Sequence, residues 1–223
     1  MQLLILAKRP VAGRAKTRLM PAFGPEGSAA LAAAALADTF DAASRSGADR
    51  VVVAFDGDPS GVVPDRFEVV PQCTGDLAAR LTHAWSSMRG PTLQIGMDTP
   101  QVTGPDLDAA FASLDRPGAD AALGLAEDGG WWALGLRHPD AMAHRVFTGI
   151  PTSEPDTGPR QQTRLVDLGL ATVALPVQRD VDLPADAFAV AAAAPHTRFA
   201  RALAELRPSV PMAAVRTGRD GSR

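Results

Sequence analysis

The chain has 223 residues, of which 46% are hydrophobic and 21% charged, and its formal net charge at neutral pH is −3. This length fits one large domain with a well-buried core, and the composition is that of an ordinary soluble protein. A small negative charge gives no general attraction to nucleic acid or to anionic membranes, so we expect neither as a partner and expect any anion binding to be local.

The cysteine count and the apolar runs indicate the compartment. Cys73 is the only cysteine, so the chain cannot form an internal disulfide. A reducing cytoplasm is therefore the compartment that we expect. The apolar run near the amino terminus is too short for a signal peptide or a membrane span, and no other run is long enough to cross a bilayer.

The first predicted element is a buried parallel strand over residues 3–6, and the loop that follows it is strongly cationic. Open α/β sheets bind ligands at the carboxyl ends of their strands, where this loop would lie. Pro10 and Gly13 favour a turn there rather than a helix. Lysine offers a mobile point charge and arginine a two-pronged donor, so the loop suits a polyphosphate; a solvated basic surface loop is the alternative. The cations of the loop are Lys8, Arg9, Arg14, Lys16 and Arg18.

One phosphate-binding motif is excluded at this loop. A P-loop carries a glycine directly before its Lys-Thr pair, whereas here Ala15 precedes Lys16 and Thr17. We therefore do not expect a P-loop ATPase.

Helices and strands alternate along the rest of the chain. In order, we expect a helix at residues 25–46, strands at 51–55 and 66–71, a helix at 77–88, a strand at 92–96 and a helix at 103–114. The second half should hold strands at 121–126 and 131–136, a helix at 159–168, a strand at 172–175 and two helices within 184–207. This alternation predicts an α/β fold with a mostly parallel sheet covered on both faces. Few large apolar residues follow Pro208, so we expect residues 1–207 to form a single domain and 208–223 a disordered tail.

A second candidate site lies directly after the strand predicted at residues 92–96. Asp98, in Met97-Asp98-Thr99-Pro100, would lie at the same edge of the sheet as the cationic loop. A carboxylate there can hold Mg²⁺ or Mn²⁺ through one bond, while diphosphate oxygens and water fill the other octahedral positions. An Asp that caps a turn before a proline is the alternative.

A third candidate follows the last predicted strand. Asp180 and Asp182 lie two positions apart, so on an extended segment their side chains point the same way and could face one cation. The alternative is a polar linker in which Asp182 and Pro184 open the next helix.

The fourth candidate is the run Asp128-Gly129-Gly130-Trp131-Trp132. Two glycines let the backbone approach a ligand closely, and adjacent indoles on a strand must point to opposite faces. One indole can then pack in the core while the other lines a pocket for a sugar or another acceptor, whose hydroxyl Asp128 could orient or deprotonate. The alternative is that both indoles are packing residues beside a turn.

Several of these stretches resemble a known family. Residues 7–19, read as Ala-Lys-x-Pro-x-x-Gly-x-x-Lys-Thr-Arg-Leu, resemble the opening of the DUF2064 family, a group of glycosyltransferase-like proteins in the GT-A nucleotide-diphospho-sugar transferase superfamily. Residues 72–77, 96–100 and 128–132 are similar to family segments as well, and the resemblance covers about residues 1–190. The stretch Ile-Pro-Thr-Ser at 150–153 departs from the family pattern, because Thr152 stands where the family usually has tryptophan.

The resemblance implies a single-domain, GT-A-like and Rossmann-like three-layer sandwich, and it implies roles for the cationic loop. Lys16 and Arg18 would hold the donor phosphates, with Arg14 and Lys8 as weaker helpers and with Gly13 in the same loop.

The resemblance also implies roles for the acidic and aromatic residues. Asp98 and Asp182 would hold the metal, because a late Asp completes the metal site in such proteins and Asp182 matches it better than Asp180. Asp98 and Asp128 would be the catalytic carboxylates. Gly75 and Asp76, at a predicted helix start, could contact the base or ribose, although Asp76 there could simply favour the helix dipole. The acceptor side would be formed by Gly129, Gly130, Trp131 and Trp132.

The implied activity is transfer of a glycosyl group from a nucleotide-activated donor, a nucleoside di- or triphosphate or a nucleotide-sugar, to a small-molecule acceptor with Mg²⁺ or Mn²⁺. Two alternatives stay open. Nucleotidyl transfer is the first, since Lys-Thr-Arg-Leu also resembles the phospholactate and phosphoenolpyruvate guanylyltransferases of deazaflavin cofactor biosynthesis. The second is a binding module that senses a nucleotide without catalysis.

Overall fold

The computed structural model describes residues 1–151 and 154–206, and within them the chain forms one seven-stranded sheet. The strands are β1 (Gln2–Lys8), β2 (Arg50–Asp56), β3 (Glu68–Pro71), β4 (Thr92–Ile95), β5 (Ala121–Leu125), β6 (Trp131–Leu136) and β7 (Thr172–Ala174). They follow the order β3-β2-β1-β4-β6-β5-β7 across the sheet. Of the described strands, only β6 runs against the others, antiparallel to β4 and β5. The predicted mixed, mostly parallel sheet is confirmed.

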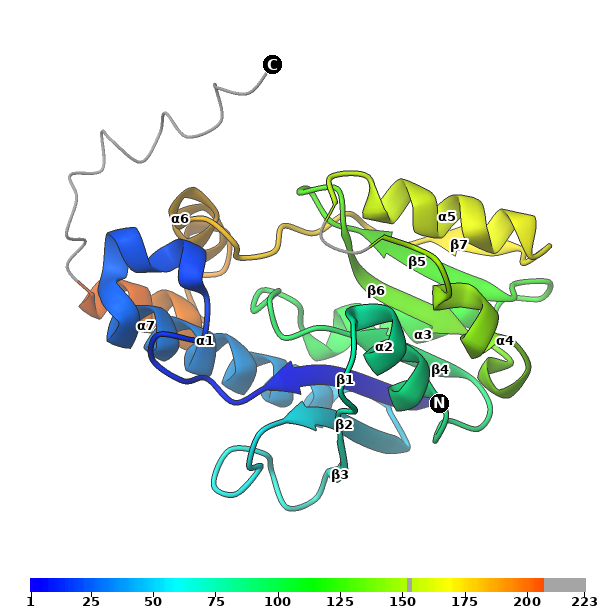
Figure 1. The fold of residues 1–223 in the computed structure, drawn as a ribbon, viewed down its shortest axis with the longest axis horizontal. Helices are drawn as coiled ribbons and strands as arrows, with labels where there is room; N and C mark the ends of the chain where they lie inside the picture. The colour runs from blue at the N-terminus through cyan, green and yellow to red at the C-terminus, as the bar shows by residue number, and fades with distance from the viewer. Residues whose placement is uncertain (152–153, 207–223) are drawn as a thin grey trace.

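Helices cover both faces of this sheet, which gives three layers (Figure 1). Leu36 of α1 and Phe111 of α3 belong to the core on one face, and Leu81 of α2, Val146 of α4 and Leu165 of α5 belong to the core on the other. The last two helices, α6 and α7, pack with α1 in a third cluster beyond the sheet. The helices of the described residues are η1 (Thr17–Leu19, a 3-10 turn), α1 (Met20–Arg45), α2 (Leu77–Trp85), α3 (Gly104–Leu114), α4 (Pro139–Phe147), α5 (Thr157–Asp167), α6 (Pro184–Ala193) and α7 (Arg198–Glu205).

The central strand β1 is apolar on both faces because helices cover both. Leu3, Leu4 and Ile5 are fully buried. They pair in parallel register with residues 51–53 of β2. This burial explains why the strand reads as a continuous apolar run rather than as an alternating one.

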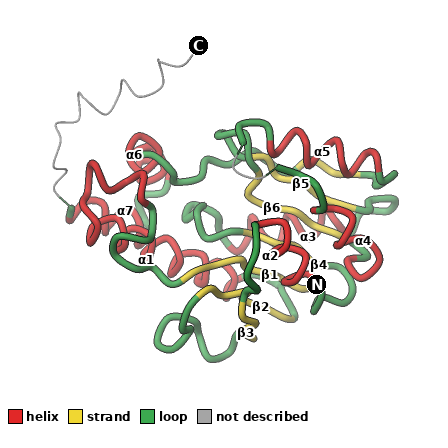
Figure 2. The backbone as a smooth tube through the Cα atoms, in the orientation of Figure 1, coloured by secondary structure: helices red, strands yellow, loops and turns green. Residues whose placement is uncertain are grey.

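The strand directions bring distant segments of the chain to one edge of the sheet. Lys8 at the end of β1 lies opposite Asp56 at the end of β2, and Ile5 lies opposite Ile95 at the end of β4. Because β6 runs the other way, its first residue, Trp131, lies at this same edge. The loops that leave β1 and β4 therefore emerge on the side where α6 and α7 lie (Figure 2).

Two helices differ from the sequence prediction. The helix at residues 139–147 was not predicted; it spans nine residues, and Ala143, Val146 and Phe147 form its short buried face. A face of one or two turns gives too weak a periodicity to separate a helix from a loop. The first long helix begins earlier than predicted, at Met20, with a kink at Gly24, where φ is 70°.

The described residues contain no helix that is long and apolar enough to cross a bilayer. Two expectations fall outside these residues, namely the disordered tail at residues 208–223 and the departure from the family pattern at Thr152.

Candidate functional site

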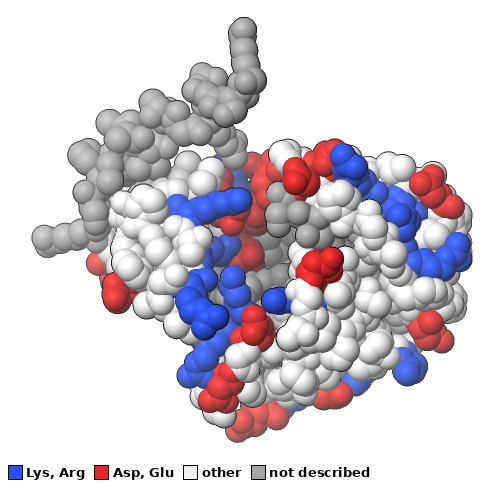
Figure 3. Space-filling model, viewed as in Figure 1, with Lys and Arg blue, Asp and Glu red and all other residues white. Residues whose placement is uncertain are grey.

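A cleft of about 880 Å³ opens at the carboxyl edge of the sheet. Figure 3 shows it as a hollow, with lysine and arginine side chains gathered along one side and mostly uncharged surface on the other. The loops after β1 and β4, the turn before β6 and the segment before α6 all contribute to its walls. The predicted site residues that line it are Lys8, Arg14, Lys16, Arg18, Asp98, Asp128, Gly130, Trp131 and Asp182.

Lys16 has an unusual backbone conformation. Its φ of 47° and ψ of 51° are left-handed, and it is the only non-glycine residue in the described part of the chain with positive φ. That conformation costs a residue with a Cβ about 1–2 kcal/mol, so it persists only where surrounding contacts hold it. Such strain concentrates at functional sites.

The ammonium group of Lys16 lies between two carboxylates. Its Nζ is 2.8 Å from Oδ1 of Asp98 and 3.6 Å from Oδ1 of Asp182, and it also donates to the carbonyl of Val181. Burial by itself would lower the pKa of Lys16, but the attraction of Asp98 and of the neighbouring carboxylates outweighs burial and raises the pKa. Lys16 is therefore charged at neutral pH.

Further cations surround Lys16. Arg18 forms an ion pair with Asp182. Lys8 and Arg14 line the cleft, and neither makes an ion pair or a side-chain hydrogen bond within residues 1–151 and 154–206. Arg80 of α2 also lines the cleft, although no motif in the sequence marks it as a site residue. Together these side chains make one side of the cleft strongly positive.

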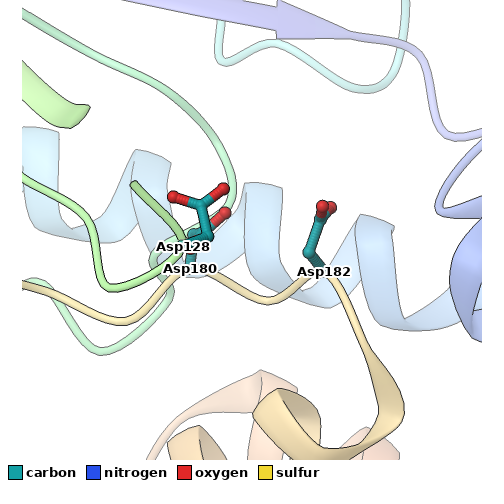
Figure 4. Close-up of side chains that lie close together, drawn as sticks. All are labelled: Asp128, Asp180 and Asp182. Carbon is teal, nitrogen blue, oxygen red and sulfur yellow. The ribbon is translucent and has the colours of Figure 1, made fainter. Parts of the chain in front are cut away.

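Three carboxylates gather beside the cations. One oxygen from each of Asp128, Asp180 and Asp182 lies within 4.8 Å of the others. In Figure 4, Asp128 comes from the turn between β5 and β6, while Asp180 and Asp182 come from the extended segment before α6. Burial, followed by repulsion from Asp128, raises the pKa of Asp180 to about 6.

The chemistry of this donor set fits a divalent cation. Carboxylate oxygens are the ligands that Mg²⁺ and Mn²⁺ prefer, and a cation here would stabilise the charged form of Asp180, whose pKa is raised first by burial and then by repulsion from Asp128. Asp180, ranked below Asp182 from the sequence, belongs to this cluster. Asp98 does not, but Lys16 joins it to Asp182, and the amide of Val181 donates to the carbonyl of Asp98 at 2.9 Å.

The turn before β6 is shaped by its glycines. Gly129 has a φ of 94°, and a Cβ there would lie 1.8 Å from the carbonyl oxygen of Pro155. Its own carbonyl accepts from the amide of Gly158 at 2.7 Å, which ties the turn to the start of α5. Oδ1 of Asp128 accepts from the amide of Gly130 at 2.8 Å, so the turn also fixes the carboxylate at the cleft.

The two indoles after this turn point to opposite faces, as predicted. Trp131 is half-buried, lines the cleft and stacks on Phe147, with 6.4 Å between the ring centroids. Trp132 is only 4% exposed and donates from Nε1 to the carbonyl of Pro176 at 2.9 Å. Trp131 is thus the indole available to a ligand, and Trp132 is a core residue.

Other predicted residues lie outside the lining of the cleft. Asp76 caps α2 by accepting from the amide of Ala79 at 2.8 Å, and Gly75 precedes it with a φ of 123°. Gly13 occupies a turn of the cationic loop with a φ of 78°. Gly129 and Trp132 support the cleft from behind, as described above. A local structural role, in a helix cap, a turn or the core, accounts for each of these residues.

Sequence reasoning missed the glutamines of the cleft. Gln72, Gln94 and Gln161 all line it. Gln94 carried a usable signal, because it is a polar residue inside the short apolar strand at residues 92–95. Gln161 carried none, since a glutamine on a polar-looking helix is ordinary.

The chain is similar to one sequence family and to many solved structures. The sequence model of the family described as "Uncharacterized protein conserved in bacteria (DUF2064)" matches residues 30–154, more than half of the chain. No curated protein matches the sequence.

Among the similar structures is a candidate nucleotide-diphospho-sugar transferase from Desulfovibrio desulfuricans, which is 24% identical with a TM-score of 0.81; the alignment covers 92% of this chain and 94% of that one. A CMP:2-keto-3-deoxy-manno-octonic acid synthetase in complex with CTP is 13% identical with a TM-score of 0.55, covering 86% and 97% of the two chains. The Rv0371c protein of Mycobacterium tuberculosis in complex with manganese is 21% identical with a TM-score of 0.52, covering 85% and 97%. At these identities the likeness establishes the fold, which nucleotide-sugar transferases and nucleotidyltransferases share.

Proposed function

The chain belongs to the DUF2064 family, and from this membership and the geometry of the cleft we propose that it is a metal-dependent transferase that uses a nucleotide-activated donor. The group transferred is a glycosyl group, and the acceptor is a small molecule. The observation that carries the proposal is that one cleft at the carboxyl edge of the sheet combines a cationic side with a cluster of three carboxylates.

The donor phosphates would bind on the cationic side. Lys8 and Arg14 have no partner in the described residues and would meet the phosphates first. Lys16 and Arg18 already pair with Asp98 and Asp182, so they would exchange or share those partners when phosphate arrives. Lysine and arginine both form strong charge-assisted hydrogen bonds with phosphate oxygens, which supports this assignment.

The metal would lie among the carboxylates. Asp182 is the ligand favoured both by the family resemblance and by the cluster, and Asp128 and Asp180 are close enough to join it. Asp98, the other predicted ligand, contacts Lys16, which supports a place for it at the junction of metal and phosphate. A bound Mg²⁺ or Mn²⁺ would neutralise the negative charge that develops on the leaving diphosphate.

The acceptor would bind beside Trp131. Asp128 lies on the turn that leads into this residue, and both line the cleft. A carboxylate at that place can orient an acceptor hydroxyl or take its proton. Gly130 lines the same wall, and its amide donates to Oδ1 of Asp128, which fixes that carboxylate beside the acceptor.

Nucleotidyl transfer is the second candidate, because known nucleotidyltransferases share the fold. In that reaction the donor is a nucleoside triphosphate, and the second substrate attacks its α-phosphate. A module that senses a nucleotide without catalysis is the third candidate. The three differ in which donor is consumed, so they can be separated directly.

The test is a donor panel. UDP-, GDP- and dTDP-sugars and the four nucleoside triphosphates are tested for protection against thermal unfolding, with and without Mn²⁺, and ligands that protect are then tested for turnover. A ligand that binds the native state raises the unfolding midpoint by mass action, so modest affinity is visible at millimolar concentration. Protection by a nucleotide-sugar that depends on Mn²⁺, followed by its turnover, supports glycosyl transfer. Consumption of a triphosphate instead supports nucleotidyl transfer, and binding without turnover supports the sensor. If no nucleotide binds, the proposal fails.

A further inference from the structure

Two glutamines whose side chains are almost fully buried line the cleft. Gln94 of β4 is 2% exposed and Gln161 of α5 is 1% exposed, and both line the cleft. They belong to the face of the sheet that α2, α4 and α5 cover, where Trp131 and Phe147 also lie. Buried polar side chains normally use their whole hydrogen-bonding capacity, so any unused group at such a place calls for a reason.

Chemistry determines which end of each amide is unused. The indole N–H of Trp85 can only donate, and it donates to Oε1 of Gln94 at 2.5 Å. The NH₂ group of Gln94 is therefore the end without a partner in the described residues. The carbonyl of Val146 can only accept, and it accepts from Nε2 of Gln161 at 3.1 Å. The carbonyl oxygen of Gln161 is the end left without a partner in the same part of the chain.

The cleft thus presents one donor and one acceptor from side chains that are otherwise buried, and neither atom is among the fully buried unpartnered atoms of the described residues, so a ligand in the cleft can reach both. A phosphate or carboxylate only accepts and would satisfy Gln94 while repelling the oxygen of Gln161. An ammonium group only donates, so it would satisfy the oxygen of Gln161 and leave the NH₂ group of Gln94 without an acceptor. A hydroxyl both donates and accepts, so a molecule with several hydroxyls satisfies both amides and carries no charge into a buried site.

Trp131 adds a flat apolar surface to the same wall. One side of its indole stacks on Phe147, with an angle of 26° between the rings, and no described residue accepts from its Nε1. Ligand pockets typically combine such an aromatic surface with a few fixed polar groups. A ring with an apolar face and hydroxyls at its edge matches the indole of Trp131 together with the two amides.

We propose that Gln94, Gln161 and Trp131, which we call the amide pocket, bind an uncharged polyhydroxylated ring. The ring is the sugar of the donor or the sugar of a free acceptor. This inference deepens the proposed function and rests on it for the position of the nucleotide, on the cationic side of the cleft. The preference for hydroxyl groups follows from the two amides, and the preference for a ring follows from the indole of Trp131.

The first test uses the unmodified protein. Thermal protection is titrated with the pairs UDP and UDP-glucose, GDP and GDP-mannose, and dTDP and dTDP-glucose, with UDP-glucuronate as a charged ring, and with glucose, galactose and mannose alone. If the ring belongs to the donor, a nucleotide-sugar binds at least about fivefold more tightly than its nucleotide, the equivalent of one hydrogen bond, and the glucuronate loses that gain. If the ring belongs to the acceptor, a free sugar protects by itself.

The outcomes separate this inference from the proposed function. Nucleotides that bind while no sugar adds protection, free or conjugated, would overturn the amide pocket and leave the proposed function standing. If free sugars protect the protein while no nucleotide binds, the amide pocket stands and the proposed function is overturned. A glucuronate that binds as well as the glucose conjugate would also overturn the inference, because the amides would then not select against charge.

Variants test the residues. Gln161→Met and Gln94→Met should each remove about fivefold of the sugar-dependent affinity and leave the affinity for the nucleotide alone unchanged. Gln101→Met is the matched control, because Gln101 donates to the carbonyl of Arg179 outside the cleft. If Gln94→Met fails to fold because it leaves Trp85 Nε1 unpaired, the double variant with Trp85→Phe removes both partners. Variants that bind sugar like the parent, or that lose no more than Gln101→Met, would overturn the assignment.

Discussion

At the scale of single residues, the site is a balance of opposite charges. Lys16 is held in a strained backbone conformation by contacts with Asp98, Asp182 and the carbonyl of Val181. Burial, and then repulsion from Asp128 in the cluster that could hold a metal, raises the pKa of Asp180 and favours its protonation. The ligand-free protein therefore has a strained backbone at Lys16 and a destabilised carboxylate at Asp180. A ligand of the right charge can reduce the free-energy cost of the second.

Replacing Lys16 should weaken nucleotide binding. Lys16→Ala removes a charge-assisted hydrogen bond to phosphate, which is worth roughly 1–3 kcal/mol, and isothermal titration with the best ligand of the donor panel measures the loss. The control is Arg9→Ala, a neighbouring cation that bonds the carbonyls of Asp58 and Ser60 instead of lining the cleft. Equal affinity in the parent and Lys16→Ala would remove Lys16 from the phosphate site.

The raised pKa of Asp180 predicts how stability depends on pH in metal-free protein. Its pKa rises from 3.8 in the unfolded chain to about 6 in the folded one, so the native state holds this proton more tightly. Its contribution to the free energy of unfolding is then complete below about pH 4 and is lost as pH rises through about 6. Asp180→Asn should remove this loss and stabilise the protein above pH 6, by roughly 1 kcal/mol because Asp180 is partly exposed and water screens the repulsion.

Urea unfolding at about pH 5 and pH 7.5, with chelator present, measures this difference. Asp65→Asn is the control, since Asp65 is exposed and outside the cluster. A pH profile that Asp180→Asn leaves unchanged would contradict the crowding of the three carboxylates.

The metal ligands can be told apart by two further variants. Nucleotide affinity should depend on Mg²⁺ or Mn²⁺, and Asp182→Asn should abolish this dependence while the fold remains intact. Asp98→Asn should do the same if Asp98 is a direct ligand. If it acts only through Lys16, the metal dependence will persist at reduced affinity. If the parent protein binds the nucleotide equally well with and without Mg²⁺ or Mn²⁺, the proposed metal site is wrong.

At the scale of elements, the turn between β5 and β6 does most to shape the cleft. Its glycines allow close contact with residues 155 and 158, its carboxylate enters the acidic cluster, and its two indoles divide between the cleft and the core. Under the proposed function, this one hairpin would contribute to the metal site and to the acceptor site, and it also packs into the core. Its indole pair allows these roles to be tested separately.

Alanine substitutions of the two tryptophans should affect different properties, namely stability for Trp132 and transfer for Trp131. Trp132→Ala should lower the free energy of unfolding by roughly 3–5 kcal/mol, because it empties a buried site in the core. Trp131→Ala should keep most of the stability and the affinity for donor phosphates, while transfer to the acceptor falls. Thermal unfolding and a turnover assay on both variants measure the contrast. If both variants merely unfold, or if neither loses turnover, Trp131 belongs to the packing alone.

At the scale of the whole molecule, the sequence predicted most of the architecture and part of the site. Strands such as β1 and β2 could be predicted because they are buried on both faces and therefore form continuous apolar runs. The helix α3 could be predicted because Thr103 and Pro105 mark its start, and Leu107, Phe111 and Leu114 follow at helical spacing. The helix α4 was not predicted because it is only nine residues long and its buried face is correspondingly short. Directions of strands are not visible in apolar runs, so the reversal of β6, which brings Trp131 to the cleft, had to come from the structure.

The residues of the site divide in the same way. The cationic loop and Asp98 could be predicted because they follow buried strands, and Asp182 because of the family resemblance. The sequence predicted that Asp180 and Asp182 could face one cation, but it did not predict that Asp128 joins them, since the folded turn between β5 and β6 brings it there. Gln161 lies in the second half of the chain and meets the cleft through α5, a contact that no local pattern encodes.

The tail remains a prediction from composition. Removal of residues 210–223 should leave the unfolding midpoint within experimental error, because the segment offers few large apolar groups to bury. Differential scanning fluorimetry on the truncated and full chains measures it, and a clear drop on truncation would show that the segment docks.

The contact between Lys16 and Val181 also has a consequence for biosynthesis. The two residues are 165 positions apart, so the cationic loop leaves the ribosome long before Asp182, one of its two carboxylate partners, is made. Contacts that close so long a stretch of chain form late in folding, after local helices and neighbouring strands. A nascent or prematurely terminated chain would therefore display the positive loop without Asp180 or Asp182 to balance it. Ligand binding would begin only once nearly the whole domain had been made, so binding reports that synthesis and folding are complete.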